Sequence, residues 1–393
     1  MKNYKLTRAA CFLGMVTQAI CLNLAPLFFV IFHTDYGISY ERIGRLVLFT
    51  FAVQIVVDLA CIKIADKLGF RKCTTIAQAT TALGLIMLGL LPRLFPNPYP
   101  WLILSVCVYA VGSGFLEVIV SPIIEAIPKE SRSSAEMSLL HSFYCWGQMA
   151  VVLLSTLALR LMGSNNWFIL PLVWALVPLL NLFLFLGAPM PPAVPETQRM
   201  KPGTLFRQPL FWVLLAAMVC GGASELSMSQ WASTFAEKGL HISKTMGDLL
   251  GPCMFAGFMG IGRAVFGRYG DKLPGNTVML CCGIGAAACY LLAIFAPLPV
   301  LGLAGCALCG LAVSLMWPGT LSAAAARFPL GGTAMFSLLA VAGDLGGSLG
   351  PWITGLVADH SAGGLKAGLL AALIFPLGVI TTSLLQRKKK QPG

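Results

Sequence analysis

Long apolar stretches separated by short polar segments run through the whole chain. Each of twelve stretches holds about 20 or more mostly apolar residues, the length that a helix needs to cross the hydrocarbon core of a bilayer. They cover residues 9–32, 43–62, 73–93, 100–124, 136–160, 167–188, 209–234, 246–267, 276–296, 299–325, 333–357 and 365–386. The pattern predicts an all-α membrane protein with twelve transmembrane helices.

One polar segment is much longer than the others. Residues 189–208 are rich in proline and then in charged and polar residues, with six predicted helices before them and six after. We therefore expect an N-terminal six-helix bundle over 1–188, a cytoplasmic central loop over 189–208 and a C-terminal six-helix bundle over 209–393. An even number of helices places both termini on the same side.

The charged residues support this topology. Only 11% of the residues are charged, against about 25% in soluble domains, which excludes a soluble enzyme or a disordered chain. With both termini inside, 19 of the 27 Lys and Arg residues lie in cytoplasmic segments, 7 lie outside and one, Arg263, lies within a helix. Basic residues in every second loop indicate a membrane protein with cytoplasmic termini and no nucleic-acid partner. A bacterial inner (plasma) membrane fits this orientation.

The two halves of the sequence share an internal repeat. A shift of 205 positions places Asp66-Lys67-Leu68 on Asp271-Lys272-Leu273, and a shift of 196 places Gly114 on Gly310 and Pro122 on Pro318. Such matches indicate a duplicated unit of parallel topology. Transporters built from two halves place their substrate site between them near mid-depth, so we expect a polar cavity there.

A short charged motif occurs in both halves. The segment 65–72, Ala-Asp-Lys-Leu-Gly-Phe-Arg-Lys, resembles the Major Facilitator Superfamily signature G-x-x-x-D-R/K-x-G-R-R/K, although Ile62 stands at the leading glycine. The segment 267–272 repeats the motif without the trailing basic pair. The resemblance implies the major facilitator fold and a gating role for Asp66, Arg71 and Asp271, whose charged contacts hold helices together in one state and release them in another.

The fourth predicted helix carries a narrower resemblance. Glu117 lies four residues before Ser121-Pro122, which is similar to the fucose permease-type branch of sugar:proton symporters, where a glutamate precedes Asn-Pro. The resemblance implies proton-coupled sugar transport with Glu117 as a functional acid. In that branch an aspartate follows Leu-Asn in the first helix, whereas Leu24 follows Asn23 here.

Ionisable residues within predicted helices are the strongest functional candidates, because a charge in the bilayer costs about 2.5–3.5 kcal/mol on insertion scales. Glu117 has apolar sequence neighbours that favour the neutral form of its carboxyl group, and Glu225 lies in the most polar helical segment. We expect both to take part in proton coupling. Asp58 and Arg263, at nearly equivalent positions of the repeat, and Asp344 in a glycine-rich helix are predicted to act in gating.

A sugar or similar polar solute needs amide and carboxylate partners for its hydroxyl groups and an aromatic face for its ring. The residues of these types on the predicted helices form the candidate substrate site: Gln18, Asn23, Glu117, His141, Tyr144, Gln148, Glu225, Gln230, Trp231 and Trp317.

Three functional classes remain open from the sequence. The first is a proton-coupled symporter for a small polar solute, working in the lipid bilayer as a monomer. The second is an efflux antiporter for drugs, although the predicted fifth helix lacks the Gly-Pro motif of that class. The third is a membrane enzyme or receptor, but no nucleophile–base pair, phosphate loop or metal-ligand spacing is present. The 13 cysteines are scattered through apolar segments, so we expect no metal and no cofactor.

Overall fold

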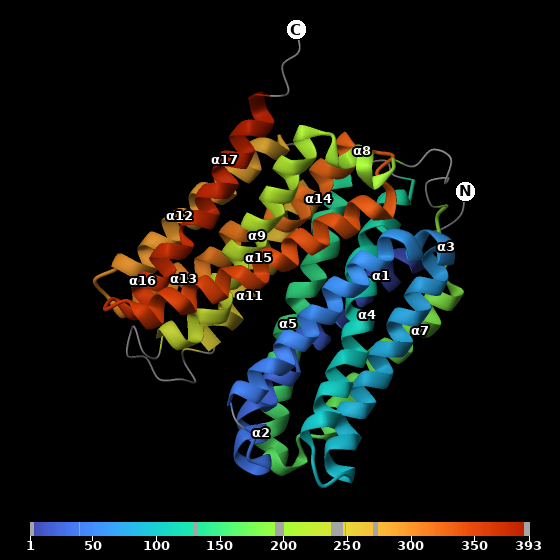
Figure 1. Ribbon diagram of the computed structural model, residues 1–393, viewed down its shortest axis with the longest axis vertical. Helices are drawn as coiled ribbons and strands as arrows, with labels where there is room; N and C mark the ends of the chain where they lie inside the picture. Colours follow the sequence, from blue (N-terminus) through green and yellow to red (C-terminus); the bar gives the residue numbers. More distant parts are fainter. Residues whose placement is uncertain are drawn as a thin grey trace. The chain divides into compact units, whose positions relative to one another are not determined.

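The computed structural model describes residues 4–38, 40–128, 133–192, 200–236, 247, 249–269 and 274–388. The described elements are all helical (Figure 1). In chain order they are α1 (Lys5–Asn23), η1 (Ala25–Phe28), α2 (Phe29–Tyr36), α3 (Tyr40–Leu94), α4 (Tyr99–Ala126), α5 (Ser133–Met162), η2 (Ser164–Asn166), α6 (Ile169–Trp174), α7 (Leu176–Gly187), α8 (Pro202–Phe206), α9 (Pro209–Thr234), η5 (Leu249–Cys253), α11 (Met254–Tyr269), α12 (Gly275–Phe295), α13 (Pro299–Val313), α14 (Met316–Arg327), α15 (Gly332–His360), α16 (Gly364–Ala372) and α17 (Ile374–Lys388).

Twelve helical segments in the described residues are long and apolar enough to cross a membrane, which confirms the predicted number. They are Lys5–Phe28, Arg45–Ala65, Lys67–Leu94, Tyr99–Ala126, Ala135–Met162, Ile169–Gly187, Pro209–Ala232, Leu249–Tyr269, Gly275–Phe295, Pro299–Arg327, Gly332–Ala358 and Gly364–Gln386. Each overlaps its predicted counterpart, and the ends differ by a few residues because apolar patterning continues into helix termini.

Packing divides the chain into two compact units. Unit 1 comprises Met1–Pro128, Phe143–Arg199 and Gly332–Ser337. Unit 2 comprises Lys129–Ser142, Met200–Gly331 and Leu338–Gly393. Within unit 1, α4 packs against α1 and against both arms of α3, and within unit 2, α9 packs against α13, α14 and α17. Each candidate site described below lies within one of these units.

Helix α3 contains two of the membrane-spanning segments, joined by a turn at Gly69. The backbone of Gly69 has φ of 77° and ψ of 159°, a conformation that strongly favours glycine. Because nothing lies within 4 Å of a β-carbon built at this position, the glycine is required by its backbone angles rather than by crowding. The turn lies inside the charged motif of residues 65–72.

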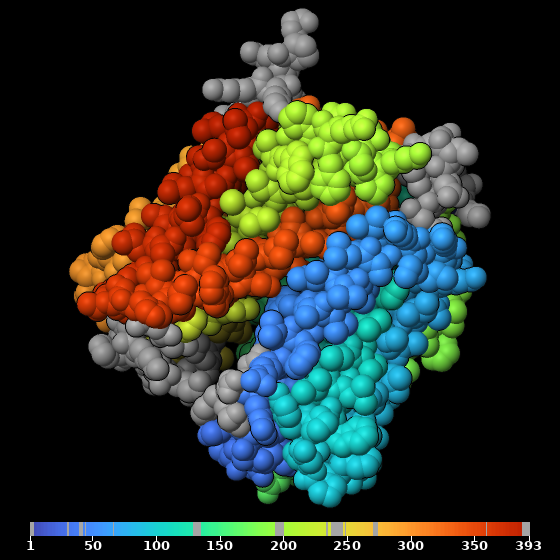
Figure 2. All heavy atoms as spheres, in the orientation of Figure 1, coloured from blue at the N-terminus to red at the C-terminus, as the bar shows by residue number. Residues whose placement is uncertain are grey.

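The helix surfaces are apolar where a soluble protein would be polar. Leu161 is 77% exposed, Val300 is 74% exposed and Phe183 is 67% exposed. Large apolar side chains in water would be unfavourable, whereas lipid accepts them. Figure 2 shows α16 and α17, in red, on the outer surface of unit 2, where Leu377 and Leu384 are exposed. This surface is typical of a protein surrounded by lipid.

Candidate functional site

Glu117 lies in α4 at the centre of a polar cluster in unit 1. Its Oε2 accepts a hydrogen bond from Nε2 of Gln18 in α1 at 2.8 Å and another from Nε2 of Gln54 in α3 at 3.0 Å. Gln18 is 5% exposed and Gln54 is fully buried, while Glu117 is half-buried. Three helices thus place two neutral amides on one carboxylate oxygen.

Small residues of α4 allow this close approach. A β-carbon at Gly114 would lie 3.0 Å from Cβ of Val57 and 3.3 Å from Cα of Gln54 in α3. A β-carbon at Gly112 would collide with Thr81 and with the carbonyl oxygen of Ala77 in the second arm of α3. Because backbones can approach only where side chains are small, Gly114 lets the first arm of α3 come close enough for Gln54 to bind Glu117, and Gly112 lets the second arm pack on α4.

Further buried polar groups lie on the same helices. Asp58, one helical turn after Gln54, is fully buried, and so are Gln78 and Ser113. Oε1 of Gln54, both amide atoms of Gln78 and Oγ of Ser113 have no hydrogen-bond partner among the described residues. Buried polar atoms of this kind favour water or a polar solute as partners. The helices that hold Glu117 and its two amide partners therefore carry several further buried polar groups.

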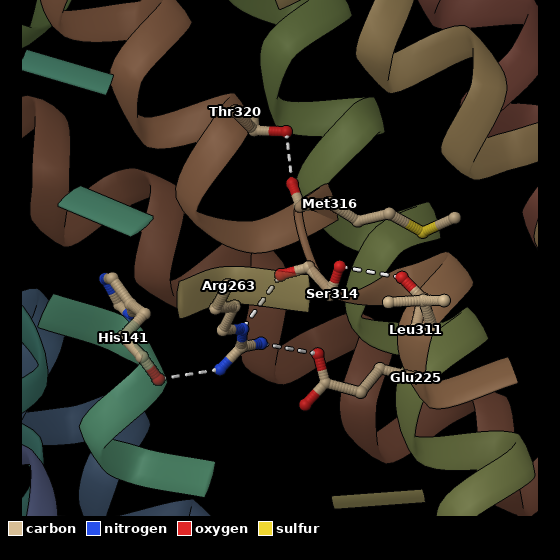
Figure 3. A network of polar contacts seen from close by, with 7 residues as sticks. All are labelled: His141, Glu225, Arg263, Leu311, Ser314, Met316 and Thr320. Carbon is tan, nitrogen blue, oxygen red and sulfur yellow. Dashed lines mark hydrogen bonds and ion pairs between the residues drawn. The ribbon is translucent and has the colours of Figure 1, made fainter. Parts of the chain in front are cut away.

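Unit 2 contains a different arrangement, centred on Arg263 in α11 (Figure 3). The guanidinium group donates from Nη2 to Oε2 of Glu225 in α9 at 3.2 Å, forming an ion pair. It also donates from Nε to the carbonyl oxygen of Ser314 at 2.8 Å and from Nη1 to that of His141 at 3.1 Å. Arg263 is 3% exposed and Glu225 is 13% exposed. Oγ of Ser138 in α5 donates to the carbonyl oxygen of Arg263 at 2.8 Å.

The carbonyl group of Ser314 is available to Arg263 because of Pro318. In an uninterrupted helix the backbone N–H of residue 318 would donate to this carbonyl, but proline has no N–H. The break between α13 and α14 follows from the same proline. The carbonyl that the proline leaves without a helical donor is satisfied by the arginine instead.

Several other predicted site residues make contacts of their own. Nδ2 of Asn23 donates to the carbonyl oxygen of Ala19 in its own helix at 2.9 Å. Nε1 of Trp231 donates to the carbonyl oxygen of Pro351 in α15 at 3.0 Å. The ring of Trp317 packs on Gly343 of α15, where a β-carbon would collide with it.

Arg71 binds the end of a helix. Its guanidinium group donates to the carbonyl oxygens of Phe185, Leu186 and Ala188 at the C-terminus of α7, where a cation is favoured by the helix dipole. This contact joins the charged motif to α7. The side chain of Asp66 and all of Asp271 lie outside what the structure describes.

The remaining predicted residues differ in burial. His141 and Asp344 are buried, at 6% and 5% exposed. Tyr144 and Gln148 are half-buried, and Gln230 is exposed. The structure brings Gln18 to Glu117 and brings Glu225 and the backbone of His141 to Arg263.

Sequence reasoning missed Gln54, Ser138 and Ser314. Gln54 is a polar residue one turn before Asp58 in an apolar run, so its position was a usable signal. Ser138 and Ser314 take part through a hydroxyl and a backbone carbonyl, and neither contact has a signature in the sequence. No group of three or more His, Cys, Asp or Glu that would hold a metal ion occurs among the described residues.

Comparison with known proteins identifies the family. The model of the Major Facilitator Superfamily matches residues 10–351 and 240–393. The chain therefore belongs to the Major Facilitator Superfamily and is a multi-pass membrane transporter. A search of curated proteins found no match.

Solved structures share the fold at low sequence identity. The transporter FucP in its outward conformation has a TM-score of 0.82 at 14% identity, over 98% of this chain and 99% of that chain. A variant of the E. coli fucose:proton symporter FucP has a TM-score of 0.81 at 15% identity, over 98% and 99%. The proton:xylose symporter XylE bound to 6-bromo-6-deoxy-D-glucose has a TM-score of 0.82 at 11% identity, over 98% and 95%. These likenesses establish the fold.

Proposed function

We propose that this transporter is a proton-coupled symporter for a sugar or a similar small polar solute. Glu117 is the proton carrier, and the polar cluster around it contributes to solute binding. The transporter works by alternating access of its two six-helix halves, over 1–188 and 209–393, in a bacterial inner membrane with both termini in the cytoplasm. The solved structures with a similar fold include proton symporters for fucose and xylose, which supports this class of solute.

The observation that carries the proposal is the pair of neutral amides on Glu117. A proton carrier has to exist in both protonation states during its cycle. Because Gln18 and Gln54 are neutral, protonation of Glu117 leaves neither of them as a buried unpaired charge. The amide donors and the carboxylate also match the hydroxyl groups of a sugar.

The pair of Glu225 and Arg263 has the opposite property. Protonation of Glu225 would leave the guanidinium group, 3% exposed, without its anionic partner, which is costly in a buried environment. We therefore assign Glu225 and Arg263 to holding α9 and α11 together. In this proposal Glu117 alone carries the coupled proton. The transporter then needs no acidic residue after Asn23, where Leu24 stands.

The direction of driven transport tests the proposal against an efflux antiporter. The purified protein is reconstituted into vesicles, an inward proton gradient is imposed, and labelled fucose, xylose and related sugars are followed. A symporter accumulates its solute inside above the external concentration, and a protonophore abolishes the accumulation. An antiporter would expel solute under the same gradient. Expulsion, or accumulation that ignores the gradient, would contradict the proposal.

A further inference from the structure

A cavity of about 260 Å³ lies within unit 2. It is lined by residues from the beginning of α9, the end of α11, the beginning of α12, α14 and the end of α17. Its walls combine apolar side chains such as Leu214 and Phe266 with the polar residues Asn276, Ser322, Arg327 and Gln386. None of the functional residues discussed above lines it.

The polar lining residues share one chemical property. Each of them donates hydrogen bonds, Arg327 is positively charged, and no Asp or Glu lines the cavity among the residues that the structure describes. Arg327 is exposed and makes no hydrogen bond or ion pair with residues that the structure describes. The cavity therefore favours a ligand with an anionic, hydrogen-bond-accepting group.

Ser322 adds a second and independent sign of a ligand. Its side chain is 8% exposed, and its Oγ has no hydrogen-bond partner among the described residues. Leaving such a group unsatisfied costs about 1–3 kcal/mol. Ser322 precedes Arg327 by five positions in α14, so its Cα lies roughly 7–8 Å farther along the helix axis from the C-terminal end of α14 than the Cα of Arg327.

The polar lining residues other than Ser322 lie near the ends of their helices. Arg327 and Gln386 lie near the ends of α14 and α17, and Asn276 lies at the start of α12, all at the side that the basic residues mark as cytoplasmic. Leu315, which lines the cavity before α14 begins, is roughly 18 Å from Arg327 at the helical rise. The lining is thus most polar at the membrane surface and apolar toward the bilayer centre.

We propose that this cavity binds an anionic phospholipid of the cytoplasmic leaflet. The phosphate group pairs with Arg327, with Asn276 and Gln386 as further donors. An ester carbonyl is the next acceptor along the lipid, and it accepts a hydrogen bond from the hydroxyl group of Ser322. The acyl chain then lies along the apolar wall of the cavity. Basic pockets between transmembrane helices on the cytoplasmic side suit such headgroups.

Thermal unfolding of the purified protein in detergent tests this site with defined lipids. Phosphatidylglycerol is expected to raise the Tm more than phosphatidylcholine at the same concentration, since ligand bound to the folded state stabilises it. Soluble glycerol phosphate, which has the headgroup chemistry without the acyl chains, is expected to leave the Tm unchanged. An equal shift with glycerol phosphate would overturn the lipid in favour of a soluble anion.

Two substitutions locate the effect. In Arg327→Gln, phosphatidylglycerol should raise the Tm no more than phosphatidylcholine does. Ala323→Phe, which fills the cavity, should reduce the increase in Tm caused by either lipid. The control Arg160→Gln removes an exposed arginine from unit 1 and should keep the full difference between the two lipids. An Arg327→Gln protein that still distinguishes the lipids as the native protein does would refute the site.

Discussion

Glu117 of unit 1 and Glu225 of unit 2 both lie in membrane-spanning helices, and the side chains that bind their carboxylates differ in charge. Glu117 in unit 1 accepts two hydrogen bonds from neutral amides, whereas Glu225 in unit 2 pairs with a buried guanidinium group. The two amides accommodate both protonation states of Glu117. The guanidinium group stabilises only the charged state of Glu225. An intramembrane acid therefore has to be judged by its partners and not by its presence alone.

The partners also differ in what holds them in place. Gln18 and Gln54 contact Glu117 through side-chain amides, which bind hydroxyl groups of a solute equally well. Arg263 additionally binds the backbone carbonyls of His141 and Ser314, which side-chain substitution cannot remove. We infer an adaptable cluster in unit 1 and a fixed one in unit 2.

The largest expected effect is on stability and follows from removing the cation of unit 2. Arg263→Met leaves Glu225 buried without its cationic partner and the carbonyl group of Ser314 without the donor that Arg263 supplies, which should cost about 3–5 kcal/mol of folding free energy. The loss is measured as a lower Tm or a shorter half-life in detergent. The double variant Arg263→Met/Glu225→Met should recover most of it, because the unpaired charge is gone. A single variant as stable as the native protein would show that the ion pair contributes nothing.

A smaller effect is expected from the amides of unit 1, and it should appear in binding rather than in stability. In the proposed site the amide of Gln54 binds a hydroxyl group of the solute, and Gln54→Leu removes this neutral hydrogen bond. Such a bond contributes about 0.5–1.5 kcal/mol, so solute affinity should fall by up to about tenfold. Equilibrium binding of the sugar identified by the transport assay measures this. The control Thr75→Val removes an exposed hydroxyl that donates only within its own helix and should leave affinity unchanged. Unchanged affinity in Gln54→Leu would remove the amide from the site.

The smallest effect concerns the carbonyl of Ser314. Pro318→Ala supplies a backbone N–H that competes with Arg263 for this carbonyl, so the contact with Arg263 should lose about 1 kcal/mol. Alanine also favours the helix, so the effect is measured as a double-mutant cycle with Arg263→Met. Pro318→Ala should be less favourable in the native background than in the Arg263→Met background. A coupling energy of zero would show that the arginine and the proline act independently.

Much of the fold could be predicted from the sequence. The twelve spans follow from uninterrupted apolar length, and the structure confirms their number. The family follows from the charged motif at 65–72, and the family model confirms it. These features are local along the chain, so one sequence is enough to find them.

The partners of the site residues could not be predicted in the same way. From the sequence, Glu117 and Glu225 are both predicted to be proton-coupling acids, because both are acidic residues within predicted transmembrane helices. Only the structure shows that Gln54 lies beside one and Arg263 beside the other. Those contacts join residues 63 and 38 positions apart. The carbonyl of Ser314 is a backbone group that any residue possesses, so its role depends on Pro318 and on the packing of α11.

The pH dependence of solute binding in Glu117→Gln and Glu225→Gln tests the central claim most directly. The proposed mechanism has the protonated transporter bind solute, so the affinity of the native protein should fall as the pH rises and Glu117 loses its proton. Glu117→Gln imitates the protonated state and should bind with an affinity that no longer depends on pH, while Glu225→Gln should keep the native pH profile. Two results would contradict the assignment of the coupled proton to Glu117. One is a native pH dependence of solute affinity in Glu117→Gln, and the other is a loss of that pH dependence in Glu225→Gln alone.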